Sequence, residues 1–208
     1  MNGTTRTVTG TTAMNTKVRY ITVTAMLSAV AFVLMYLEIA IPIMPAFIKF
    51  DFSDLPALLG SFAMGPMCGV LICLIKNVLH LAFSNSMFVG ELSNFILGAV
   101  FVGVAGIFYR HKKTRKSAFL GAAVGALAMA LISIVTNYFV VYPAYTVLYS
   151  MPMDAIIGMY KAILPASDTL LKSLVIFNLP FTFAKGMIDT AVCFAVYKRI
   201  SPILKKSA

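Results

Sequence analysis

Charge is what this sequence lacks most. Only 12% of its 208 residues are charged, acidic residues number 7 against 17 Lys and Arg, and tryptophan is absent. With 60% hydrophobic residues, the composition falls outside the range of soluble globular domains and within the membrane class. The length suits one membrane domain of about six spans at roughly 20 residues each.

Several catalytic and nucleotide-binding patterns are also missing. The sequence has no Gly-x-x-x-x-Gly-Lys-Ser/Thr loop, no His-Glu-x-x-His and no Gly-x-Ser-x-Gly. We therefore expect no P-loop hydrolysis of ATP and no enzymatic activity. The two histidines and three cysteines have no metal-ligand spacing, so neither a metal nor a cofactor is expected. The cysteines lie inside apolar runs and are predicted to be small core residues, namely Cys68, Cys73 and Cys193.

The basic residues that are present gather in three segments, which contain twelve of the seventeen. They are an N-terminal arm (Arg6, Lys17, Arg19), a linker (Arg110, Lys112, Lys113, Arg115, Lys116) and a tail (Lys198, Arg199, Lys205, Lys206). Lys and Arg are retained on the cytoplasmic side during membrane insertion, so both termini and the linker are predicted to be cytoplasmic. This topology explains the positive net charge, and a nucleic-acid partner is not expected.

The apolar runs predict an all-α integral membrane protein with six transmembrane helices. The expected spans are 20–41, 55–64, 67–83, 91–109, 118–141 and 170–197. Pro42 and Pro45 are expected to end the first span, and Gly65-Pro66 separates the second from the third. The second span is too short to cross unaided.

The rest of the chain is divided by the same pattern. We expect a cytoplasmic arm over 1–19, a membrane domain over 20–198 and a cytoplasmic tail over 199–208. The segment 142–169 contains three prolines and is predicted to be a loop with one short interfacial helix. Residues 1–19 have no apolar core, so the first span is expected to be a retained helix and not a cleaved signal peptide.

Four polar residues form a stripe on the last span. Asn178, Thr182, Lys185 and Asp189 fall within about 60° of one another on a helix. A lysine at this depth is costly and must face protein or a cavity. Either Lys185 pairs with Asp189 one turn away, or Lys185, Thr182 and Asn178 line a pocket for a polar solute.

Other polar residues near the outer ends allow two interpretations each. Asn137 either reads an amide-like edge of a ligand or makes an interhelical hydrogen bond. Glu91 and Asn94 share a helix face and form either helix caps or the rim of a pocket. Lys76 either snorkels, pairs with an acidic group or contacts ligand. The tyrosines near residue 145 are typical of an interfacial belt.

The first span carries small residues at a fixed spacing. Ala25 and Ala29 form a small-xxx-small pattern, which lets another helix approach closely. Such patterns are common in Ala-rich spans, so this one predicts a docking face only together with other observations.

Taken together, several segments resemble the riboflavin-specific S components of energy-coupling-factor (ECF) transporters. These are Phe47-Ile-Lys-Phe-Asp-Phe-Ser-Asp-Leu-Pro-Ala-Leu-Leu-Gly60, Ile75-Lys-Asn-Val-Leu-His80, Gly90-Glu-Leu-Ser-Asn-Phe95, Asn137-Tyr-Phe and Pro180-Phe-Thr-Phe-Ala-Lys-Gly186. The similarity extends from Tyr20 to Lys198, and its most specific part is Lys-x-Asp-Phe-Ser-Asp-Leu-Pro.

The resemblance implies a six-helix membrane subunit that captures riboflavin at the outer face. It implies partners as well: a transmembrane coupling subunit and two cytosolic ATPases, which is consistent with the missing P-loop. Asn137, Thr182 and Lys185 would contact the pyrimidine edge of the flavin, Thr182 standing where some members have Asn. Ala25 and Ala29 match the docking motif of the family.

A flavin also suits the residues on physical grounds. Its ring is a large apolar plane with one hydrogen-bonding edge, which requires apolar walls and a few convergent polar groups. Candidate walls are Ile43, Met44, Phe47, Phe50 and Tyr145. Two alternatives remain at this stage: the same architecture for another vitamin, such as thiamine or biotin, and a stand-alone ion-coupled secondary transporter.

Overall fold

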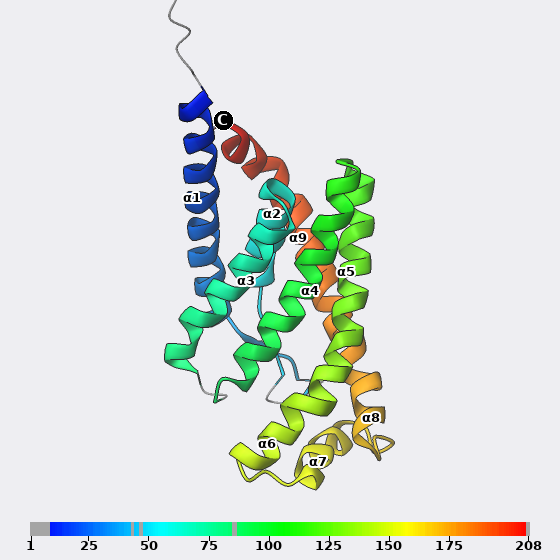
Figure 1. Ribbon diagram of the computed structural model, residues 1–208. Helices are drawn as coiled ribbons and strands as arrows, with labels where there is room; N and C mark the ends of the chain where they lie inside the picture. Colours follow the sequence, from blue (N-terminus) through cyan, green and yellow to red (C-terminus); the bar gives the residue numbers. More distant parts are fainter. Residues whose placement is uncertain (1–8, 43, 46–47, 85–86, 207–208) are drawn as a thin grey trace, which may run out of the picture.

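The computed structural model describes residues 9–42, 44–45, 48–84 and 87–206, and within these ranges the side chains from 16 to 197. The chain is mostly helical, and Figure 1 shows its long helices side by side in one bundle. Both described ends of the chain lie at one end of the bundle, which we call the terminal face. The opposite end, with α6, α7 and α8, is called the loop face.

The helices are separated by short connections. Their bounds are α1 Thr9–Tyr36, α2 Asp54–Met64, α3 Pro66–His80, the 3-10 turn η1 Leu81–Phe83, α4 Val89–His111, α5 Arg115–Thr136, the π-helical turn η2 Asn137–Val141, α6 Tyr142–Leu148, α7 Met153–Ile163, α8 Leu170–Ser173, the π-helical turn η3 Leu174–Asn178 and α9 Leu179–Lys206. Strands β1 Ile39–Ala40 and β2 Lys49–Phe50 form an antiparallel pair.

Five stretches are long and apolar enough to cross a membrane: Thr16–Tyr36, Pro66–Phe83, Val89–His111, Arg115–Leu148 and Leu170–Tyr197. The predicted second span corresponds to α2, which has 11 residues. At 1.5 Å per residue it measures about 16 Å, roughly half of a bilayer core. The prediction that this helix is too short to cross a membrane unaided is confirmed.

The first predicted span is too long at its end. Helix α1 ends at Tyr36 and not at Ile41, because Ile39 and Ala40 pair with Phe50 and Lys49 in the small sheet. Lys49 also pairs with Glu38 across this hairpin. The predicted arm and tail are partly helical, since α1 begins at Thr9 and α9 runs to Lys206.

The prediction of a loop from residue 142 onward is also wrong in its first part. Helix α5 continues through η2 into α6 and ends at Leu148, although Pro143 lies in this stretch. The π turn accounts for this. The Tyr142 N–H donates to the Asn137 carbonyl five residues back, so the helical hydrogen-bond pattern is already shifted at the point where Pro143 has no N–H to donate. The expected short helix is α7.

The last long helix has the same construction. In η3 the Leu179 N–H donates to the Leu174 carbonyl, and Pro180 follows directly. Each π turn therefore precedes a proline, and each carries an asparagine, Asn137 in η2 and Asn178 in η3. Such turns often occur at functional sites.

Most of the buried apolar residues form one core between the long helices. Helix α4 packs on α3 and α5, α5 packs on α9, and the short α2 contacts α1, α3, α4 and α9. All three cysteines are free and buried, as predicted. A smaller core beneath the loop face joins α6, α7 and η3 around Tyr142 and Tyr160, so the segment 142–163 is tied to the bundle.

Candidate solute-binding site

Two adjoining cavities lie in the loop-face half of the bundle. The inner cavity has a volume of about 190 Å³ and is lined by Ile48, Lys49, Asp51, Asp54, Gly90, Ser93, Asn94, Leu97, Met129, Asn137, Val141, Tyr142, Tyr145, Asn178, Phe181, Thr182 and Lys185. The outer cavity, about 480 Å³, shares Lys49, Asp51, Gly90, Asn94 and Tyr145 with it and adds residues of α1 and α3. Three residues of the predicted stripe, Asn178, Thr182 and Lys185, therefore line the inner cavity, whereas Asp189 is not among its lining residues.

Lys185 is fixed at this cavity by two carboxylates, one from the loop before α2 and one from its first residue. Its Nζ lies 2.8 Å from Asp51 Oδ2 and 3.6 Å from Asp54 Oδ2. The predicted alternative, a Lys185–Asp189 pair, is wrong: both carboxylate oxygens of Asp189 are buried and have no hydrogen-bond partner among the described residues. Side chains on a helix lean toward its N-terminus, so Lys185 extends toward the loop face and away from Asp189.

A second buried lysine completes the charge cluster. Lys76 Nζ lies 2.6 Å from Asp54 Oδ1 and donates to Ser53 Oγ at 2.5 Å. Lys76 is fully buried, which selects the interpretation in which it pairs with an acidic group. Ser53 occupies the N-cap position of α2, but its hydroxyl serves Lys76 and makes no capping bond.

The electrostatics of Asp51 follow from these neighbours. Burial raises the pKa of its carboxyl group, but the ammonium groups of Lys185 and Lys76 and the bonds from Lys185 and Ser53 lower it by more. The net effect holds the pKa of Asp51 well below its usual range, so the group is an anion at neutral pH. Asp51 Oδ1 also accepts the Ser53 N–H at 2.8 Å, which fixes the loop before α2.

A second hydrogen-bonded group stands at the wall beside α7. Tyr160 donates to Asn178 Oδ1 at 2.7 Å, and the hydroxyls of Tyr142 and Tyr160 are 2.5 Å apart. Burial and the neighbouring Tyr142 raise the pKa of Tyr160, which keeps its hydroxyl protonated as a donor. Asn178 thus lines the inner cavity with its oxygen already engaged.

The other predicted site residues are distributed as follows. Asn137, Thr182, Asn94 and Tyr145 line the inner cavity. Glu91 lines the outer cavity and accepts from Ser84 Oγ, with His80 Nδ1 2.9 Å from its other oxygen.

The candidate wall residues on the 41–50 segment contribute less than expected. Met44 and Phe50 are buried but are among the lining residues of neither cavity. Ile43 and Phe47 lie outside the described residues, so their placement stays a prediction. Apolar walls come instead from Leu97, Met129, Val141 and Phe181, which sequence reasoning did not select.

Sequence reasoning also missed the roles of Asp51 and Asp54. A signal was available, because two lysines inside apolar spans require acidic partners and the chain has only seven acidic residues. The predicted docking residues Ala25 and Ala29 are exposed on α1, whereas the adjacent Thr24 and Ser28 are buried. The face with Ala25 and Ala29 has room for another helix.

A helical membrane bundle with two adjoining polar-lined cavities near one end defines a membrane-embedded solute-binding protein. The family model described as "ECF transporter, substrate-specific component" matches residues 19–197. The chain belongs to this family, the substrate-specific (S) components of ECF transporters.

Named relatives and a solved structure are similar over nearly the whole chain. The riboflavin transporter RibU of Staphylococcus aureus (strain TCH60) is 34% identical over 188 residues, which cover 90% of this chain and 93% of that protein. The riboflavin transporter FmnP of Bacillus subtilis (strain 168) is 32% identical over 194 residues, 91% of this chain and 96% of that one. A structure titled "Structure and mechanism of the S component of a bacterial ECF transporter" superposes with a TM-score of 0.72 at 32% identity, covering 91% of this chain and 99% of that chain.

Proposed function

We propose that this protein binds riboflavin at the outer face of a prokaryotic cell membrane and delivers it for ATP-driven uptake. The observation that carries the proposal is the inner cavity, in which Lys185, Thr182 and Asn137 converge between apolar walls. This is the arrangement that a planar apolar ring with one hydrogen-bonding edge requires. The names of the relatives at 34% and 32% identity point to the same solute.

The two cavities suggest how the two halves of the vitamin are divided. The flavin ring would enter the inner cavity, with its pyrimidine edge at Asn137, Thr182 and Lys185. The ribityl chain, which carries hydroxyls, would extend into the outer cavity toward Asn94 and Glu91. At about 190 Å³ the inner cavity is below the roughly 300–1,000 Å³ of small-molecule sites, so the outer cavity of about 480 Å³ has to hold part of the ligand.

The protein would work as a binding subunit and not as an enzyme, without a cofactor or a metal. A transmembrane coupling subunit and two cytosolic ATPases would supply the energy, and α1 would meet the coupling subunit at Ala25 and Ala29. Helix α2 would count as the sixth membrane helix, seated between its neighbours. Both termini would then be cytoplasmic. Along the chain, the arm 1–19 would precede the membrane domain 20–198, and the tail 199–208 would follow it.

Titration of flavin fluorescence tests the proposal directly. Purified protein should quench riboflavin saturably at micromolar concentration or below, without ATP and without partners. Thiamine and biotin should not compete. Absence of saturable quenching, or displacement by thiamine or biotin, would move the assignment to another vitamin.

A second measurement addresses a stand-alone carrier. Uptake should require the coupling subunit and ATPases and should not depend on a Na⁺ or proton gradient. Uptake that persists without the ATPases would mean that the chain transports on its own.

A further inference from the structure

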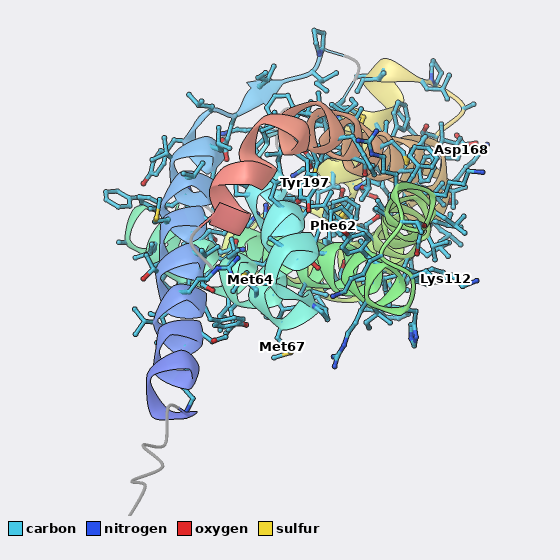
Figure 2. The ribbon with its side chains drawn as sticks, turned by 90° about the horizontal axis from the view of Figure 1, so that it is seen from above. Phe62, Met64, Met67, Lys112, Asp168 and Tyr197 are labelled. Atoms are coloured by element: carbon cyan, nitrogen blue, oxygen red, sulfur yellow. The ribbon has the colours of Figure 1, made fainter. Side chains whose placement is uncertain are left out.

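A third cavity lies at the opposite end of the bundle, at the junction of α2 and α3. Its volume is about 430 Å³, and it is lined by Tyr20, Ser61, Phe62, Ala63, Met64, Gly65, Pro66, Met67, Gly106, Tyr109, Arg110 and Lys113. We call it the terminal cavity. Figure 2 looks onto this end of the bundle, with Phe62, Met64 and Met67 labelled around α2 and the start of α3.

The charge of the terminal cavity is entirely positive. Arg110 and Lys113 are the charged residues among those that line it, and no carboxylate is present among them. In the part of the chain that the structure describes, neither side chain makes an ion pair, and both are exposed. This contrasts with the inner cavity, where both lining lysines have carboxylate partners, Lys185 with Asp51 and Lys49 with Glu38.

The backbone leaves the space open and adds to its positive potential. Gly65 has φ +106°, a conformation that favours glycine, and a Cβ built there would meet nothing within 4 Å. Helix α3 begins at Pro66, so the positive end of its dipole lies at the cavity. Close packing of α4 on the junction forms the wall, because a Cβ at Gly106 would lie 2.1 Å from Ser61 Oγ and 3.0 Å from Pro66.

The remaining walls are apolar or aromatic, and they reach the outside of the bundle. Met67 is 64% exposed, and Tyr20 and Tyr109 are only partly buried. Tyrosines of this kind are typical of the membrane–water interface, where one end of a side chain is apolar and the other polar. The end of the bundle that holds the basic linker is also the end predicted to be cytoplasmic.

We infer that the terminal cavity binds the phosphodiester headgroup of an anionic phospholipid from the inner leaflet. Arg110 and Lys113 would contact the phosphate, and the acyl chains would follow the exposed apolar surface beside Met67. Basic pockets between membrane helices on the cytoplasmic side are suited to such headgroups. The inference concerns neither riboflavin nor the loop-face cavities, so it stands or falls separately from the proposed function.

The experiment uses the full chain in nanodiscs of phosphatidylcholine with increasing phosphatidylglycerol. Native mass spectrometry counts the phosphatidylglycerol molecules retained after release from the disc, and an unchanged melting temperature confirms folding. The wild-type chain should retain phosphatidylglycerol selectively over phosphatidylcholine. Arg110→Gln/Lys113→Gln should weaken this retention about thirty-fold, since each cation near the surface contributes about fivefold.

Two further variants separate a built site from general attraction. Lys17→Gln/Lys116→Gln removes the same charge from the same end of the bundle at two positions that do not line the cavity, and it should weaken retention less than about threefold. Ala63→Phe keeps both cations and fills the cavity, and it should weaken retention about tenfold or more. Equal loss in the Lys17/Lys116 variant would mean diffuse electrostatics and would overturn the inference.

Two other outcomes would also overturn it. If inorganic phosphate at millimolar concentration raises the melting temperature in detergent as much as phosphatidylglycerol does, the cavity is a free-anion site. If phosphatidylglycerol is not retained, but Arg110→Gln/Lys113→Gln fails to assemble with the coupling subunit, the cavity receives an acidic segment of that partner and not a lipid.

Discussion

Lys76 Nζ lies 2.6 Å from Asp54 Oδ1, and both side chains are sealed inside the bundle. Through Asp54 this pair reaches Lys185, whose Nζ is 3.6 Å from the other carboxylate oxygen. The two lysines and the two aspartates Asp51 and Asp54 thus balance each other, and the position of Lys185 at the inner cavity depends on a lysine that does not line it.

Replacement of Lys76 should therefore strongly destabilise the folded protein. Lys76→Met leaves Asp54 buried beside a single cation, and breaking a buried pair costs about 3–5 kcal/mol of unfolding free energy. Thermal unfolding in detergent should show a large fall in melting temperature. The double variant Lys76→Met/Asp54→Asn removes both charges and should recover part of that loss, and a double variant no better than Lys76→Met would show that the two residues do not act as a pair.

Lys185→Ala should weaken riboflavin binding by about 1.5–3 kcal/mol, the usual range for a hydrogen bond to a charged group. Its removal also leaves Asp51 without its cation, so the melting temperature should fall as well. Asp51→Asn is the matched control, because it disturbs the same pair and keeps the ammonium group at the cavity. Affinity that falls equally in both variants would assign Lys185 a structural role only.

Asp189→Asn should keep or raise the melting temperature. Both oxygens of Asp189 are buried and without a hydrogen-bond partner in the described structure, and such a group costs about 1–3 kcal/mol or more when charged. Asparagine has nearly the same volume and no charge. A clear fall in melting temperature would reveal that Asp189 supports Lys185 at a distance.

Ala29→Leu should abolish uptake and leave riboflavin binding intact. Ala29 is exposed on α1 and lines neither the inner nor the outer cavity, and a leucine would hold a partner helix away. Uptake in cells that express all components, together with binding by the purified variant, measures both effects. Ala29→Ser keeps the small volume and should transport normally, whereas normal uptake by Ala29→Leu would mean that this face docks nothing.

The sequence predicted those features of the fold that depend on local patterns, and it missed those that depend on contacts between residues far apart in the chain. The spans follow from apolar runs, which are local, and the structure contains five of them with α2 as the short one. The end of α1 was misplaced because strand pairing with residues 49–50 is not visible in a local pattern. Helix α6 was missed because proline usually ends a helix, whereas a π turn accommodates Pro143 here.

The same distinction applies to the candidate binding site. Helical periodicity alone predicted that Thr182, Lys185 and Asn178 share one face, and in the structure that face lines the inner cavity. The partner of Lys185 was not predictable in this way, because Asp51 lies 134 residues earlier and meets it only after the bundle has formed. For the same reason the apolar walls from Met129 and Phe181 could not be selected from many similar residues.

The two π turns also determine what a length change would do. A π turn holds one residue more than the α-helix it replaces, so everything beyond it is rotated by about 100°. Deleting one residue within 138–140 would repair the helix and turn Tyr142 and Tyr145 off the cavity, although no residue that lines the inner cavity had been removed. Deletion of one residue within 174–177 would likewise rotate Asn178, Thr182 and Lys185 together relative to the preceding turn, α8. The spacing of residues in these helices is thus as much a part of the ligand specificity as their identity.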